Sequence, residues 1–128
     1  MDPLQHQIDR LRPRAEALCA ALRDTAAALF DEPDIIAHCA AGTARYRLER
    51  DAASGADSLV AEWLDAHGYR LGMLVFHGDG SCFGEYDIVR AHPKRSRWFV
   101  EAVEAWAGAE SGADGGRIRA DFRLLEAP

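Results

Sequence analysis

The architecture is set by residues 70–93, which read RLGMLVFHGDGSCFGEYDIVRAHP. Both halves of this stretch are rich in aromatic and β-branched residues, and Asp79-Gly80 lies between them. An Asp-Gly pair between two apolar runs is the strongest short-range signal for a β-hairpin. Residues 71–77 and 82–89 are therefore predicted to form two antiparallel strands.

A loop of two or four residues at this turn places His77 opposite Cys82, whereas three or five residues would change the pairing. Side chains alternate along a strand, so the hairpin divides into two faces. The face predicted to belong to the core consists of Leu71, Met73, Val75, His77, Cys82, Tyr86 and Ile88. The second face consists of Leu74, Phe76, Phe83, Glu85, Asp87 and Val89.

Length and composition are those of an ordinary globular protein. The 128 residues are predicted to form a single α+β domain over residues 1–128. The net charge of −6 argues against general affinity for nucleic acids or anionic membranes. No apolar run reaches the ~20 residues of a membrane span, and the N-terminus lacks the apolar core of a signal peptide.

The cysteine pattern also bears on the compartment. Cys19, Cys39 and Cys82 are odd in number and have no recognisable framework spacing. This pattern is typical of free thiols in a reducing environment. A cytoplasmic location without disulfides is therefore expected.

The remaining elements follow from periodicity. Asp2-Pro3 predicts the start of a long amphipathic helix that reaches about Phe30 and is kinked by Pro13. Residues 34–39 and 43–50 are predicted to form a second hairpin. A second helix is expected over residues 57–67, a third helix from His92 onward, and a last strand over residues 117–125.

The expected order is therefore α-β-β-α-β-β-α-β. It predicts a two-layer fold: a mostly antiparallel five-stranded sheet with three helices on one face. The residues expected to be buried together are Leu18, Leu22, Leu48, Trp63, Val75, Tyr86, Ile88, Val103, Trp106 and Phe122.

Few residues suggest chemistry. His77 and Cys82 are predicted to face each other, and a Cys–His pair can activate a thiolate or ligate a metal. The sequence has no CxxC or HExxH motif, however, and Asp79 is explained as a turn residue. Glu85 and Asp87 lie on one face, where ion pairs with arginines are favoured over acid–base catalysis. No catalytic residue, metal ligand or cofactor is predicted.

The second sheet face is the most suggestive feature. Aromatic side chains and arginines together are typical of interface centres, although a solvated sheet face is the plain alternative. If all helices cover the other face, the exposed groups are Leu74, Phe76, Phe83, Arg45, Arg47, Arg119 and Arg123.

No known family is recognised in the sequence. The favoured interpretation is a non-enzymatic binding or adaptor domain, homodimeric or with a protein partner, that uses this face. The alternative is a small-molecule-binding protein or enzyme with a pocket near His77 and Cys82. Nucleic-acid binding through the arginine strands is disfavoured by the net charge.

Overall fold

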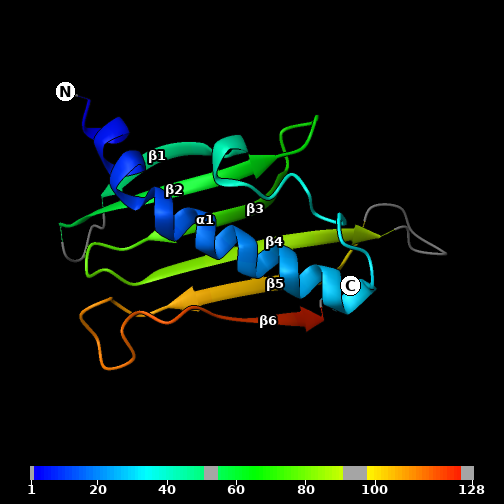
Figure 1. Ribbon diagram of the computed structural model, residues 1–128. Coiled ribbons are helices and arrows are strands. Elements are labelled where there is room, and N and C mark those ends of the chain that lie inside the picture. The colour runs from blue at the N-terminus through cyan, green and yellow to red at the C-terminus, as the bar shows by residue number, and fades with distance from the viewer. Residues whose placement is uncertain (1, 51–54, 91–97, 125–128) are drawn as a thin grey trace.

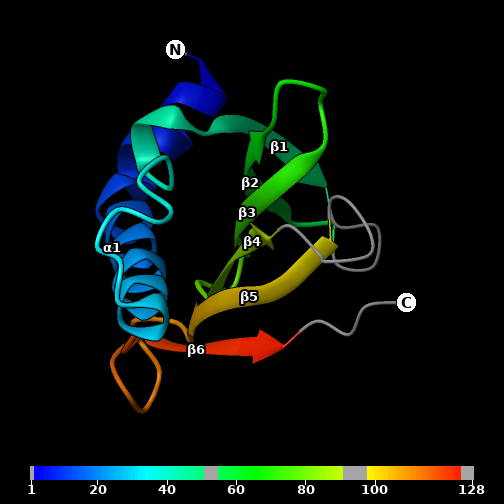
Figure 2. The same cartoon turned by 90° about the vertical axis from the view of Figure 1, so that its right-hand side faces the viewer.

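The computed structural model (Figure 1) describes residues 2–50, 55–90 and 98–124. A long helix, α1 (Pro3–Phe30), is followed by a 3-10 turn, η1 (Ala41–Thr43). The strands are β1 (Arg45–Arg50), β2 (Asp57–Leu64), β3 (Arg70–Phe76), β4 (Cys82–Arg90), β5 (Trp98–Ala107) and β6 (Arg119–Leu124). Each strand pairs antiparallel with the next, in the order β1-β2-β3-β4-β5-β6. The sheet curves around α1, which lies in its hollow (Figure 2).

The predicted fold class is wrong in its helix and strand counts. The described residues contain one α-helix and a six-stranded antiparallel sheet, not three helices and five strands. The two other predicted helices are strands β2 and β5, and residues 34–39 form turns instead of a strand. The strands expected over residues 43–50 and 117–125 are present as β1 and β6.

β2 was mistaken for a helix because it is buried on both sides. Leu59, Ala61 and Trp63 face α1, whereas Val60, on the opposite side of the sheet, is only 2% exposed. A short strand covered on both faces is a continuous apolar run, and periodicity cannot distinguish such a run from a buried helix.

β5 was mistaken for a helix because of its composition. Its sequence WFVEAVEAWA is rich in Ala and Glu, which have high intrinsic helix propensity. In the fold Val103 and Ala105 are fully buried on the side of the sheet that faces α1. Small alanine side chains let the helix pack closely against the sheet, so tertiary context overrides the local preference.

The hairpin of β3 and β4 closes through a three-residue loop. The His77 N–H donates to the Ser81 carbonyl over 2.9 Å, and Gly80 adopts a positive φ of 95°. The residue opposite Cys82 is therefore Phe76, and not His77 as predicted. This one-residue change moves Leu74 and Phe76 to the core side, and moves Met73 and Val75 to the other.

The core lies between α1 and the hollow side of the sheet. The helix contributes one stripe, which consists of Ala15, Leu18, Cys19, Leu22 and Ala26. The predicted burial of Leu18, Leu22, Trp63, Tyr86, Ile88 and Val103 is confirmed. The prediction is wrong for Trp106 and Phe122, which are exposed, and Val75 and Leu48 are only half-buried.

α1 begins at Asp2-Pro3 as the sequence predicts, and both of its ends are capped. The Asp2 carboxylate accepts a hydrogen bond from the Leu4 N–H over 3.0 Å, and Pro3 occupies the first turn. At the other end Asp31 adopts a left-handed conformation with φ 52°, and its N–H bonds back to Ala27. Pro13 lies inside the helix, which continues through it as one element.

One arginine ties the helix to two loops. The Arg14 guanidinium donates to the carbonyls of Gly116 (3.1 Å), Gly108 (2.9 Å) and Gly80 (3.3 Å). It also contacts Cys82 Sγ at 3.3 Å, and its side chain is 14% exposed. The five N–H donors of a guanidinium suit such a site, because each can satisfy a different acceptor.

Candidate functional sites on the sheet and at the end of α1

The face of the sheet turned away from α1, here called the outer face, carries an apolar row. Strand register places its members side by side in the order Arg47, Val60, Val75, Phe83, Trp106 and Arg119. Val75 and Phe83 are half-buried and Trp106 is 39% exposed. None of the four apolar residues packs against the core. The row is therefore an apolar band across four strands with an arginine at each end.

The neighbouring row on the outer face is acidic. It consists of Glu62, Met73, Glu85, Glu104 and Asp121. Arg123 lies 3.4 Å from Glu85 and 3.5 Å from Glu104. Glu62 pairs with Arg47 and, at 3.8 Å, with Arg70. Most charges on this face are thus already neutralised within the domain.

Two arginines of the outer face are exceptions. Arg45 and Arg119 are exposed and form no ion pair in the part of the chain that the structure describes. Arg119 lies beside Trp106, and Arg45 lies beside Glu62. These guanidinium groups are free to meet carboxylates of another molecule.

Among the residues that the structure describes, Asp87 has the most perturbed carboxylate. Burial and the nearby charge of Glu85 raise the pKa of Asp87 to about 6, although Arg123 and Arg70 act in the opposite direction. The usual pKa of an aspartate is about 3.9. The folded state therefore holds the Asp87 proton more tightly than the unfolded state does.

A pH dependence of stability follows. The contribution of protonated Asp87 is fully present below about pH 4 and is lost as the pH rises through about 6. We expect Asp87→Asn to remove this loss, because asparagine does not titrate. Between pH 4 and pH 7 the free energy of unfolding of wild type should then fall by on the order of 1 kcal/mol relative to that of the variant, after allowance for solvent screening. Urea unfolding at several pH values measures the difference. Parallel pH profiles for the two proteins would contradict the assignment.

The structure separates the residues of the predicted binding face. Phe83, Arg45, Arg47, Arg119 and Arg123 do lie on strands of the outer face. Leu74 and Phe76 do not: both are buried under α1, so their predicted exposure is wrong. Sequence reasoning missed Val60, Val75 and Trp106. In the sequence, Glu104 and Trp106 alternate with Val103 and Ala105. Interpreted as a strand, this pattern would have placed Trp106 on the outer face.

The predicted pairing of His77 with Cys82 is also wrong. Cys82 is buried beneath α1, and burial raises the pKa of its thiol despite the neighbouring Arg14. His77 is exposed at the turn and pairs with Ser81. His77 instead lines a small cavity of about 210 Å³ beside the first turns of α1.

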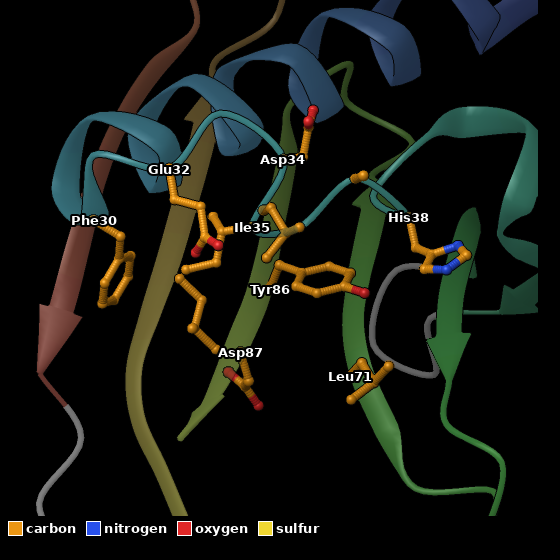
Figure 3. A pocket seen from close by; sticks show the side chains of 11 residues that line it. Phe30, Glu32, Asp34, Ile35, His38, Leu71, Tyr86 and Asp87 are labelled. Atoms are coloured by element: carbon orange, nitrogen blue, oxygen red, sulfur yellow. The ribbon is translucent and has the colours of Figure 1, made fainter. Parts of the chain in front are cut away.

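A larger cavity of about 850 Å³ lies at the C-terminal end of α1 (Figure 3). One wall is the segment after the helix, and the other is formed by β3 and β4. Its lining consists of Phe30, Glu32, Asp34, Ile35, Ile36, Ala37, His38, Leu71, Tyr86, Asp87 and Ile88. The Tyr86 ring lies in the middle, with its hydroxyl toward the side of His38 and Leu71. Burial raises the pKa of Tyr86 to about 12, so the phenol stays protonated at neutral pH.

Two thiols meet where the segment after α1 packs on the helix. Cys19 of α1 and Cys39 are both fully buried. A hydrogen bond from the Cys39 thiol lowers the pKa of Cys19 and raises the pKa of Cys39. Arg23 Nη1 also donates to the Cys39 carbonyl over 2.5 Å. These contacts hold the segment after α1 against the helix. All three cysteines are free thiols.

No protein-family model, curated protein or solved structure matches the chain. Within residues 2–50, 55–90 and 98–124, no group of three or more potential ligands is placed to hold a metal ion. No helix in those ranges combines the length and the hydropathy that crossing a membrane requires.

Proposed function

We propose that this domain binds a protein partner through its outer face. The observation that carries the proposal is the apolar row of the outer face: Val75, Phe83 and Trp106 are at least partly exposed and pack against no part of the domain's core, and Val60, which is 2% exposed, continues the row beneath its neighbours. Aromatic side chains next to arginines are the composition of energetically dominant interface residues. The ion pairs around the row would form the polar rim of such an interface.

The free arginines indicate the chemistry of the partner. Arg119 extends the apolar row at β6, and Arg45 lies beside the row at β1. A partner surface with an apolar centre and carboxylates at its edge would satisfy both guanidinium groups. Such charge complementarity mainly contributes specificity and association rate.

Curvature favours a different protein over a second copy of this chain. The outer face is convex because the sheet bends around α1 (Figure 2). Two convex faces touch over a small area, whereas a stable interface buries about 1,200–2,000 Å² in total. A partner with a concave or adaptable surface fits better.

Substitution on the outer face tests the proposal. We expect Phe83→Ser with Trp106→Ser to weaken partner binding at least about tenfold, because truncating a central aromatic residue costs about 2 kcal/mol or more. The matched control is Phe122→Ser, which removes an exposed aromatic ring from the opposite side of the sheet. The partner is first isolated from expressing cells with the wild-type domain and purified, and calorimetry then gives the dissociation constants.

Light scattering of each variant separates the outcomes. Equal affinity of the outer-face variant, the control and wild type for the purified partner would overturn the proposal. A wild-type dimer that dissociates in the outer-face variant alone would show that the occupant is a second copy. Circular dichroism shows whether the variants remain folded.

A further inference from the structure

We propose that the cavity at the C-terminal end of α1 binds a small organic cation with an apolar body, such as an arylalkylamine. The site is independent of the outer face. Its volume of about 850 Å³ suits a small ligand, since such pockets measure about 300–1,000 Å³.

The floor of the cavity holds a polar group without a partner. Tyr86 is 5% exposed, and its hydroxyl forms no hydrogen bond with any residue that the structure describes. Its neighbour Trp63, with ring centroids 5.6 Å apart, uses its own N–H on Ala40 and Thr43. A ligand in the cavity can therefore bond to this hydroxyl without displacing any partner within the described part of the chain.

The charge around the cavity is negative. Glu32 and Asp34 belong to the lining and form no ion pair within the described part of the chain, and Figure 3 shows the Glu32 side chain directed toward Ile35 and that of Asp34 toward α1. The lining contains no Arg or Lys among the described residues. The cavity also adjoins the C-terminus of α1, where the helix dipole is negative and stabilises cations. Asp87 belongs to the lining, but strand alternation turns its carboxylate toward Glu85 on the outer face.

The apolar part of the lining defines the rest of the ligand. Ile36, Tyr86 and Ile88 are buried, and Phe30, Ile35 and Leu71 are partly exposed. These side chains suit an aromatic or branched aliphatic body. A cation with such a body would place its ammonium group near the carboxylates of this wall, and its N–H groups would donate a hydrogen bond to the phenol oxygen of Tyr86.

The probe is 2-phenylethylamine, compared with neutral 2-phenylethanol and anionic phenylacetate. We expect saturable binding of the amine in NMR titrations, with chemical-shift changes at Tyr86 and at residues 32–38. The alcohol should bind at least about tenfold more weakly, and phenylacetate should not bind, because the carboxylates repel it. No saturable binding of the amine at millimolar concentration, or equal binding of all three compounds, would overturn the proposal.

Variants locate the site. We expect Glu32→Gln with Asp34→Asn to weaken amine binding about tenfold. The control, Glu16→Gln with Asp24→Asn, changes the net charge equally on the exposed side of α1 and should leave affinity unchanged. Tyr86→Phe removes only the hydroxyl and should weaken binding severalfold while the protein stays folded. Equal losses in the two charge variants would mean that net charge, not this cavity, attracts the amine. Phe83→Ser with Trp106→Ser should keep amine binding, so failure of this proposal and failure of the outer-face proposal are distinguishable.

Discussion

Gly72→Ala is expected to lower the free energy of unfolding by about 3 kcal/mol, as typical of severe overpacking. An alanine Cβ at this position would lie 2.5 Å from Tyr86 Cδ2 and 2.7 Å from the Glu85 carbonyl oxygen. The carbonyl belongs to the paired strand β4 and cannot move without disturbing the ladder. Urea unfolding should show a lower midpoint with an unchanged slope.

Two further variants make this result specific. Gly42→Ala is the matched control, because an added Cβ there would have no neighbour within 4 Å. It should be within about 0.5 kcal/mol of wild type. In a Tyr86→Ala background the ring clash is absent, so Gly72→Ala should cost less there than in wild type. Equal costs in both backgrounds would show that the Tyr86 ring does not exclude a side chain at Gly72.

Arg14→Met is expected to lower the free energy of unfolding by about 1–3 kcal/mol, because the partly buried Gly116 carbonyl and the exposed carbonyls of Gly80 and Gly108 all lose their charged donor. Methionine keeps the apolar stem of the side chain but bonds to none of the Gly80, Gly108 and Gly116 carbonyls. The ion pair with Glu110 at 3.6 Å contributes little, since Glu110 is largely exposed. Urea unfolding gives the stability change.

Arg12→Met is the control for the Arg14 substitution. Arg12 lies on the same helix but only pairs with Asp9 at the surface. Its substitution should change stability by less than about 0.5 kcal/mol. The stability loss of Arg14→Lys should lie between those of Arg14→Met and Arg12→Met, because an ammonium group keeps the charge but lacks the planar set of guanidinium donors. If Arg14→Met and Arg12→Met are equally mild, the loops do not depend on Arg14.

Periodicity was sufficient where one side of an element is buried and the other exposed. α1, β1 and β6 were predictable for this reason, and the Asp79-Gly80 turn revealed the hairpin. β2 and β5 were not, because burial on both faces and an Ala/Glu-rich composition both resemble a helix. Their strand conformation is determined by pairing with the neighbouring strands, which lie outside the short window that periodicity examines.

The binding surfaces depended on details that the sequence leaves open. A difference of one residue in the loop after His77 decided whether Phe76 or Val75 faces α1. Phe83 and the arginines were predicted on the correct face, because the sequence alternation assigned the side chains of β4, β1 and β6 to the right sides of the sheet. The cavity beside Tyr86 was not foreseeable, because it arises where residues 31–38 fold over β3 and β4.

The order of the strands also has a consequence for how the chain folds during synthesis. Every strand pairs with the next one in sequence, so the sheet can grow by short loop closures, which favours rapid folding. α1, however, packs on β5 and β6, and Arg14 bonds to a residue 102 positions away. At about 5–20 residues per second, a ribosome needs roughly 5–20 s to proceed from the end of α1 to β6. α1, which is made before all six strands, is thus the last of these elements to complete its packing, and its apolar stripe stays partly uncovered until β5 and β6 have formed.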